Sequence, residues 1–370
     1  MNKLVVIDQK LIDWVTKGEV KKNYFNPDKL YKEITILALV KSKKPSKSIL
    51  KKLCGTRSFR YIEFNSKFLV NNFFKYLIPF YLYKLLILKE LKSLSICKPK
   101  IIFCIGDGYS GYISGVISEI FNCRLVLSLH SFTNSTIFLK YFSFKEKVIY
   151  LMNLRFKRKS HKYAHQINIV YKKIEENVGD EFKKKIRLVY NRISLKKKNL
   201  YEANINLSKI NLIFVGRLIK GKSLLNIIKA IHNLENVTLT VFGDGPERLK
   251  IQKQIDIYKL HKKVFLKGFV NNEIILSKIH RYHAFIAFHK FYEFPKTIME
   301  ALSNGIPVIL NSQPSKNLYE FKKFKIIWTS DKVESYRQEI INLKKGKYNL
   351  KLIKKNNENK IKNLLNMNDD

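Results

Sequence analysis

Residues 211–230 read "NLIFVGRLIKGKSLLNIIKA" and contain a complete strand–loop–helix unit. The run 211–216 is apolar and ends in glycine, which is typical of a buried strand. In the segment after the loop, apolar residues recur at spacings of three, four and seven, which predicts one buried face of a helix: Leu224, Ile227, Ile228 and Ile231. This combination is the building block of a parallel α/β sheet.

The same alternation continues through the second half of the chain. Short apolar runs predict four further strands, at residues 237–243, 264–270, 284–289 and 307–311. Pro246 and Glu247 predict the start of one helix, and Pro295 and Gly305 predict the first residue and the end of another. We therefore expect a Rossmann-like domain over residues 201–345, followed by a C-terminal helix and polar tail over 346–370.

The first half carries six comparable runs, mostly β-branched and bounded by polar or glycine-containing segments: 3–7, 34–39, 100–105, 124–129, 167–171 and 187–190. They predict a second parallel sheet with crossover helices, in a domain over residues 1–200. The polar, lysine-rich segment 191–210 is predicted to be the linker.

Length and cysteine content narrow the class of protein. A chain of 370 residues is long enough for two domains, each with its own core. The four cysteines form no C-x-x-C pair and have no histidine cluster beside them, which argues against a disulfide framework or a zinc site. The start of the sequence, "MNKLVVIDQK", is too short and polar for a signal peptide, so we expect a cytoplasmic protein.

The chain has a formal net charge of +42, and its basic residues are unevenly spread. Residues 41–100 contain 15 basic and 2 acidic side chains. The excess reflects either the codon bias of an AT-rich genome or an anionic partner such as phosphate, nucleic acid or an acidic membrane surface. No RRM, KH or zinc-finger pattern supports a nucleic-acid binder.

Residues 68–88, "FLVNNFFKYLIPFYLYKLLIL", form an apolar stretch long enough to span a bilayer. Asn71, Lys75, Pro79 and Lys84 interrupt it, and charges at bilayer depth are costly. A helix at the core or domain edge is the favoured interpretation. The alternatives are a helix that lies in the membrane interface with its lysines snorkelling, and a transmembrane helix.

Two cations stand where an open α/β sheet binds its ligands. Arg217 and Lys222 follow the strand 211–216, at its carboxyl end. Charge-assisted hydrogen bonds from both would suit a diphosphate, although solvated surface cations are an open alternative. In "VFGDGPERLK" (241–250), Gly243 and Gly245 predict a tight strand-to-helix turn.

The segment 291–310, "FYEFPKTIMEALSNGIPVIL", places two glutamates around a helix start. Backbone amides at 294–297 can bind an anion, because the first N–H groups of a helix have no intrahelical partner. Glu300, one turn inside, can accept hydrogen bonds from ribose hydroxyls, as acidic residues do in dinucleotide folds. Alternatively, it only complements the helix dipole.

The succession "GRL…K", "GDGPE", "KGFV" and "EFP…ME…GIPVI" over residues 211–311 resembles glycosyltransferase family 4, the retaining GT-B glycosyltransferases of group 1. Weaker but colinear similarity extends to "KGEVKKNYFNP" (17–27), "VLSLHSF" (126–132) and "IRLVYNRIS" (186–194). The resemblance implies a GT-B fold, in which two Rossmann-like α/β domains with parallel sheets face an interdomain cleft.

The resemblance also implies roles for individual residues. The positions matching Arg217 and Lys222 bind the diphosphate of a nucleotide sugar, and the one matching Glu300 holds the ribose. Glu293 and His130 match catalytic positions that face the donor sugar. The remaining positions implied for donor binding are Gly18 toward the sugar, Gly268 and Phe269 near the base, and Phe294, Pro295, Lys296 and Thr297 at phosphate and sugar.

Two positions depart from the family pattern. The family places its glutamates eight residues apart, whereas Glu293 and Glu300 are seven apart, so that the family register falls on Tyr292. Ser223 stands where the family has glycine after the phosphate-binding lysine.

The resemblance therefore implies a retaining transferase that moves a hexose from a UDP- or GDP-linked donor. We expect its acceptor to be a lipid-linked or surface-polysaccharide precursor on the inner face of the cytoplasmic membrane, because residues 41–100 are basic and residues 68–88 are apolar. No metal or other cofactor is expected, and the chain has no Asp-x-Asp pair. The alternative is an impaired GT-B module that binds nucleotide or a partner without transfer. A sugar-nucleotide epimerase of the same fold is a nearer alternative, but the succession from "GRL…K" to "EFP…E" favours transfer. Sugar, linkage and acceptor are not determined by the sequence.

Overall fold

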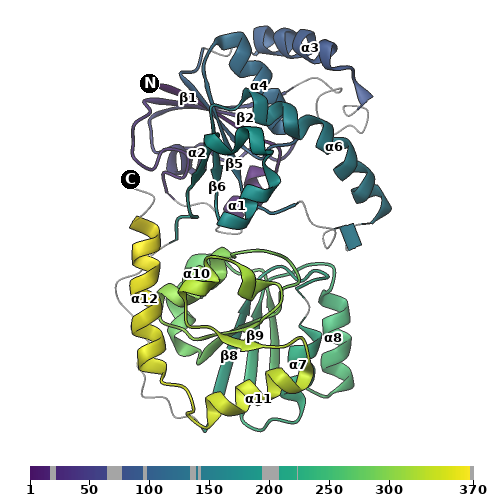
Figure 1. Ribbon diagram of the computed structural model, residues 1–370, viewed down its shortest axis with the longest axis vertical. Coiled ribbons are helices and arrows are strands. Elements are labelled where there is room, and N and C mark those ends of the chain that lie inside the picture. The colour runs from purple at the N-terminus through teal and green to yellow at the C-terminus, as the bar shows by residue number, and fades with distance from the viewer. Residues whose placement is uncertain are drawn as a thin grey trace. The chain divides into compact units, whose positions relative to one another are not determined.

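The computed structural model describes residues 1–16, 22–64, 77–94, 98–133, 139–140, 143–193, 208–222 and 224–366. The chain divides into two compact units (Figure 1). The second begins at Val189 and also takes in Tyr171–Lys173. Gly18, Ser223, residues 68–76 and the expected domain boundary at 200/201 lie outside the described residues.

The first unit is built on a seven-stranded, all-parallel sheet in the order β3-β2-β1-β4-β5-β6-β7. Its strands are β1 (Asn2–Ile7), β2 (Glu33–Ala38), β3 (Ser58–Glu63), β4 (Ile101–Ile105), β5 (Arg124–Leu129), β6 (Gln166–Ile169) and β7 (Ile186–Leu188). All six strands predicted here are present. The sequence did not predict β3, because "SFRYIE" mixes polar and apolar residues as an edge strand can.

Five described helices accompany this sheet: α1 (Leu11–Thr16), α2 (Lys47–Cys54), α3 (Phe80–Ser93), α4 (Tyr109–Phe121) and α6 (Phe144–Tyr163). Short 3-10 turns follow β6, at η2 (Lys172–Asn177) and η3 (Asp180–Lys185). A capping box between Ser143 and Glu146 starts α6. The helix α4 packs against both α3 and α6, so the three helices form one layer (Figure 1).

Aromatic rings join the helices of that layer. Tyr83 of α3, Tyr112 of α4 and Phe156 of α6 meet with ring centroids 5.4 to 5.6 Å apart. The described part of the apolar stretch 68–88 thus supplies a helix with one buried face. Among the described residues, no helix combines the length and apolar character needed to cross a membrane.

The second unit is built on a six-stranded parallel sheet in the order β10-β9-β8-β11-β12-β13. Its strands are β8 (Ile210–Val215), β9 (Val237–Phe242), β10 (Val264–Gly268), β11 (Ala284–Ala287), β12 (Val308–Asn311) and β13 (Ile327–Thr329). The five predicted strands are confirmed, and β13 is too short to give a periodic signal. Two parallel α/β sheets confirm the predicted pair of Rossmann-like domains.

The helices of the second unit are α7 (Leu225–His232), α8 (Arg248–Ile257), α9 (Asn272–Lys278), α10 (Lys296–Ser303), α11 (Val333–Lys344) and α12 (Leu350–Asn366). Three 3-10 turns complete it: η4 (Ile279–Arg281), η5 (Ser315–Asn317) and η6 (Phe321–Lys323). The helix α7 packs against α8 and α11, and α10 packs against α12 (Figure 1).

The boundaries of α10 correct one prediction and confirm another. Pro295 precedes the helix as its N-cap, because its ψ of 139° is extended; the first helical residue is Lys296. Gly305 lies just beyond the helix end with a φ of +72°, as predicted for the residue where the chain leaves the helix.

Candidate functional site

The strand order of the second unit locates a ligand-binding edge. From β8 the chain moves outward to β9 and β10, and then returns to β11 on the other side of β8. The loops after β8 and β11 therefore leave neighbouring strand ends in opposite directions. Open α/β sheets bind their ligands at this topological switch point, beyond the carboxyl ends of the strands.

Backbone hydrogen bonds join the loops at this edge. The amide of Lys290, after β11, donates to the carbonyl of Gly221, after β8, at 2.8 Å. The amide of Leu218 donates to the carbonyl of Asp244 at 2.9 Å, and Glu247 returns a bond to the Leu218 carbonyl at 3.0 Å. The loops after β8, β9 and β11 consequently form one framework.

Gly243 and Gly245 form the predicted strand-to-helix turn, and they also allow the loops after β8 and β9 to pack closely. Gly243 has a φ of +138°, and a Cβ there would lie 1.8 Å from the carbonyl oxygen of Gly216. Gly245 has a φ of +154°, and its Cβ would lie 2.4 Å from the carbonyl oxygen of Leu218. Only residues without a side chain let the two loops approach this closely.

Lys222 and Glu293, from opposite loops of the switch point, form an ion pair. The Nζ of Lys222 lies 2.5 Å from Oε2 of Glu293. The two side chains are only 15% and 23% exposed, so water screens the pair less than it screens a surface pair. The structure thus brings together a predicted diphosphate ligand and a predicted catalytic residue.

His289 adjoins this pair, and the sequence did not identify it as a site residue. Its backbone is fixed by Asn311, whose side chain accepts from the His289 amide and donates to its carbonyl, both at 2.7 Å. Burial, and then the charge of Lys222, hold the pKa of His289 well below its usual value, so the imidazole is neutral. Its position directly after the strand end was the available signal.

The start of α10 is anchored by aromatic packing. Phe294 is buried, with its ring centroid 5.1 Å from Phe321 and 6.0 Å from Phe324. Its side chain therefore belongs to the core, and only its backbone is available for the predicted ligand contact. Lys296 and Thr297 follow in the first turn with partly buried side chains.

Glu300 lies deeper in α10 and is 1% exposed. Its Oε1 accepts a hydrogen bond from Nδ2 of Asn272, the first residue of α9, at 2.9 Å. The amide of Asn272 thus compensates part of the cost of burying a carboxylate.

The remaining predicted residues have surroundings of their own. The side chain of Arg217 is exposed and makes no hydrogen bond or ion pair within the described part of the chain. Gly268 ends β10 with a φ of +63°, and Phe269 beside it is exposed. His130 belongs to the first unit, where Nε2 lies 3.0 Å from Oγ of Ser128.

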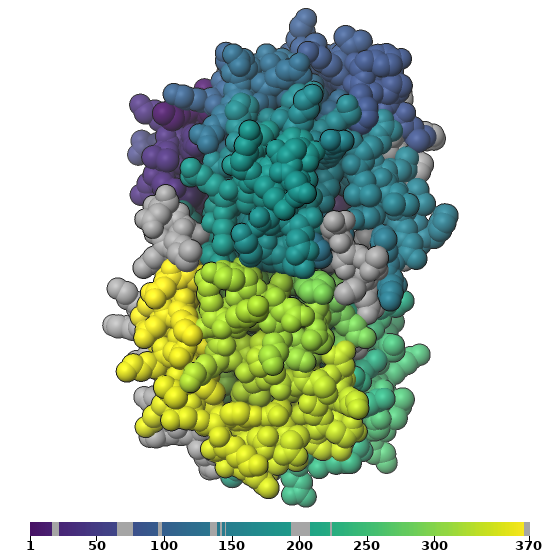
Figure 2. All heavy atoms as spheres, viewed as in Figure 1, coloured from purple at the N-terminus to yellow at the C-terminus, as the bar shows by residue number. Residues whose placement is uncertain are grey.

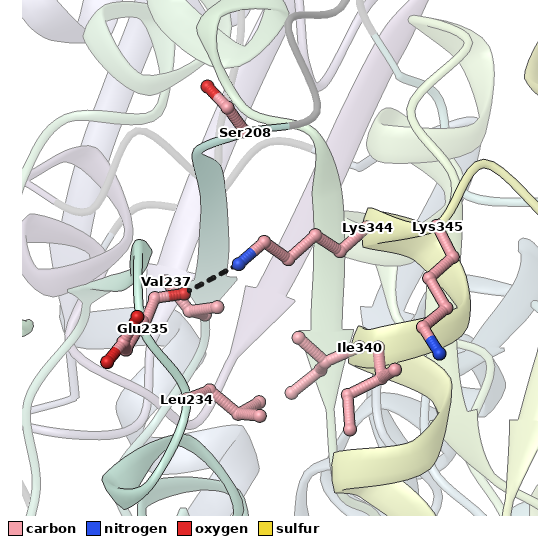
Figure 3. Close-up of a pocket in the computed structure, with 8 residues that line it drawn as sticks. Ser208, Leu234, Glu235, Val237, Ile340, Lys344 and Lys345 are labelled. Atoms are coloured by element: carbon pink, nitrogen blue, oxygen red, sulfur yellow. Dashed lines mark hydrogen bonds between the residues drawn. The ribbon is translucent and has the colours of Figure 1, made fainter.

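A pocket of about 530 Å³ lies elsewhere in the second unit (Figure 3). Its lining residues are Ser208, Leu234, Glu235, Val237, Ile340, Ile341, Lys344 and Lys345. Lys344 donates to the carbonyl of Glu235 at 3.2 Å. Because Ser208 and Val237 stand at the amino ends of β8 and β9, this pocket is at the wrong end of the sheet to be the switch-point site.

The switch-point loops and α10 fall within a region that matches a known family. Residues 196–363 match the family model of glycosyl transferases group 1. Among curated proteins, a segment is 34% identical over 110 residues to a poly(glycerol-phosphate) alpha-glucosyltransferase of Bacillus subtilis. That match covers 29% of this chain and 16% of the relative. The curated relatives are matched over less than half of their length.

Solved glycosyltransferase structures share the whole fold. Anabaena Alr3699/HepE in complex with UDP and glucose aligns with a TM-score of 0.72 and 15% identity, over 100% of this chain and 97% of that one. The lipopolysaccharide outer core galactosyltransferase WaaB aligns with a TM-score of 0.63 and 16% identity, over 99% of both chains. At such identities the likeness establishes the fold, which is the predicted GT-B arrangement of two Rossmann-like α/β domains.

The ion pair gives a first testable prediction. Glu293→Gln is expected to tighten the binding of inorganic pyrophosphate about tenfold, because it frees the Lys222 ammonium from a competing carboxylate. Isothermal titration measures the change. Glu273→Gln, an exposed glutamate of α9, is the matched control and should leave the affinity unchanged. Unchanged or weaker binding by Glu293→Gln would show that Lys222 does not meet the anion.

Proposed function

We propose that the chain is a retaining glycosyltransferase that moves a hexose from a UDP-linked sugar nucleotide to a lipid-linked or surface-polysaccharide precursor. One observation carries the proposal: a sheltered lysine and glutamate meet at the switch point, inside the region that matches glycosyl transferases group 1. We propose a UDP-linked donor and not a GDP-linked one, because the similar HepE structure is a complex with UDP and glucose.

In this proposal the second unit binds the donor. The Lys222 ammonium, the Arg217 guanidinium and the first-turn backbone N–H groups of α10, at Lys296 and Thr297, hold the diphosphate. Glu300 accepts hydrogen bonds from the ribose while Asn272 keeps its carboxylate in place. Gly268 and Phe269, at the end of β10, lie near the base.

The chemical step depends on charge that develops on the leaving diphosphate. Fixed cations and aligned amides stabilise that charge without reorganising during the reaction, which is a large contribution to catalysis in many enzymes. We assign this role to Lys222, Arg217 and α10, and we propose that the reaction uses no metal ion. Glu293, displaced from Lys222 by the diphosphate, would turn to the donor sugar. His130 and the loop at Gly18 would approach the sugar from the first unit.

The proposed acceptor follows from the relatives. The Bacillus subtilis protein is named for glucosyl transfer to poly(glycerol-phosphate), and WaaB for galactosyl transfer to the lipopolysaccharide outer core. The first acceptor is a polymer of glycerol phosphate, and the second is part of a lipopolysaccharide. We propose an acceptor of that class, with the protein acting in the cytoplasm on the inner face of the membrane.

Thermal unfolding with a panel of sugar nucleotides tests donor binding. At a hundredfold excess over Kd, a ligand stabilises the native state by about 2.7 kcal/mol. For a unit of this size that raises Tm by roughly 5–10 °C. UDP-glucose, UDP-galactose or UDP-N-acetylglucosamine should give the shift and GDP-mannose should not. The absence of any shift across the panel would contradict the proposal.

Glu300→Gln should remove most of the rise in Tm that the sugar nucleotide causes. In this variant a neutral amide replaces the carboxylate that is proposed to accept hydrogen bonds from the ribose. Each variant is compared with its own ligand-free Tm, so any loss of stability is accounted for separately. Glu334→Gln, an exposed glutamate of α11, is the matched control and should retain the full shift. If sugar nucleotide raised the Tm of Glu300→Gln by the full amount, Glu300 would not be the residue that binds the ribose.

A second candidate is binding without transfer, favoured by the closed Lys222–Glu293 pair. Release of UDP from the donor, measured with and without acceptor glycan, separates the two. A donor that raises Tm but yields no UDP under either condition would support the binding module.

A further inference from the structure

Exposed apolar side chains gather on two helices of the first unit. Of the 15 exposed large hydrophobic residues in the described chain, seven belong to α3, the turn before it, and α6. They are Leu77, Tyr81, Leu82, Leu85, Phe144, Leu151 and Leu154. Together with the exposed basic residues of the same helices, we call this surface the α3–α6 face. The other eight are spread over the rest of the chain.

The α3–α6 face is continuous because the start of α3 packs on the middle of α6. The Phe80 ring lies 5.4 Å from Phe156, and the guanidinium of Arg155 lies 4.6 Å from the Phe80 ring. Arg155 also donates to the carbonyl of Ile78 at 3.0 Å. Leu151 and Leu154 lie within one turn of Arg155 on α6. Figure 2 shows the blue and blue-green atoms of these helices at the surface of the first unit.

Cations surround the apolar side chains. The exposed basic residues are Lys84, Lys89 and Lys92 on α3, and Lys147, Arg155, Arg158, Lys159 and Lys162 on α6. The nearby acids are engaged: Glu119 pairs with Lys84 at 3.2 Å, Glu181 with Arg158 at 3.1 Å, and Glu146 caps α6. The face is therefore both apolar and positively charged.

We infer that the α3–α6 face docks onto an anionic phospholipid bilayer. Side chains such as Phe144 and Leu85 can enter the acyl boundary while lysines and arginines meet the lipid phosphates, which is how interfacial helices bind membranes. Charge complementarity selects this occupant over a second copy of the chain, because two such faces would repel each other. The inference deepens the proposed function, on whose membrane location it rests, by naming the surface that meets the membrane; it does not depend on donor binding.

Co-sedimentation of the full chain with vesicles tests the inference. Phosphatidylglycerol and phosphatidylcholine in a 3:7 ratio should bind the protein at low salt, and phosphatidylcholine alone should not. The combined variant Tyr81→Ser, Leu85→Ser, Phe144→Ser, Leu151→Ser should lower the partition coefficient at least tenfold. Lys89→Gln with Lys92→Gln should lower it roughly tenfold, because each cation near an anionic surface contributes substantially.

Matched controls lie on α8 of the second unit, where Leu249, Ile257, Lys250 and Lys253 are also exposed. Leu249→Ser with Ile257→Ser, and Lys250→Gln with Lys253→Gln, should leave vesicle binding within twofold. Three results would overturn the inference: no binding of the wild type to anionic vesicles, equal binding by the face variants, or a wild-type dimer in light scattering that the face variants convert to monomer. The assay contains no sugar nucleotide, so its outcome is independent of the thermal-shift test.

Discussion

Lys222→Met is expected to lower kcat/KM for sugar transfer by about 10²–10³-fold, the usual loss when one fixed charge-stabilising group is removed from a transition state. Lys222 follows the central strand of the second sheet and stands in a sheltered position at the switch point. The variant also leaves the Glu293 carboxylate without its ammonium partner. Initial rates of UDP release at varied donor concentration measure the effect, and most of the loss should appear in kcat.

Lys220→Met is the matched control for that experiment. Lys220 lies two residues away on the same loop, but its side chain is exposed to solvent. A loss of the same size in both variants would mean that the net charge of the loop matters and not the placement of Lys222. A loss confined to KM would mean that Lys222 binds donor and transition state equally well.

Gly243→Ala is expected to lower the free energy of unfolding by more than about 3 kcal/mol, because backbone overlap at a positive φ cannot relax through a side chain. The added Cβ would lie 1.8 Å from the Gly216 carbonyl, so the loops after β8 and β9 would have to separate. We expect Tm to fall by about 8–12 °C and the sugar-nucleotide shift to disappear. Differential scanning calorimetry with and without UDP-glucose measures both.

Gly268→Ala separates backbone strain from steric overlap. Gly268 also has a positive φ, of +63°, but the nearest atom to its added Cβ is the end of the Arg248 side chain at 3.5 Å. The left-handed conformation alone costs alanine about 1 kcal/mol, which corresponds to 2–4 °C. If Gly243→Ala and Gly268→Ala lowered the free energy of unfolding equally, the close approach of the loops after β8 and β9 would be refuted.

Most of the fold could be predicted because it is encoded in local patterns. Strands such as β8 and β12 are buried on both faces, so they appear as continuous apolar runs. The two missed strands lie at sheet edges. There β3 carries polar residues, and the three residues of β13 give no period. The N-cap position of Pro295 was missed by one residue because proline fixes φ but leaves ψ free.

The sequence suggested candidate residues for the site but not the contacts between them. Order along the chain and strand ends identified Lys222, Glu293 and Glu300 as candidates. Their pairing depends on how loops fold back, so neither the Lys222–Glu293 ion pair nor the Asn272–Glu300 hydrogen bond followed from spacing. The role of Gly243 was also underestimated, because the carbonyl it must avoid is 27 residues earlier in the sequence.

A crystal structure of the full chain with UDP would test the central claim most directly. We predict that the diphosphate lies at the switch point of the second sheet, with a phosphate oxygen within about 3.2 Å of Nζ of Lys222 and the Lys222–Glu293 ion pair broken. A nucleotide bound elsewhere, with Lys222 still joined to Glu293, would contradict the account.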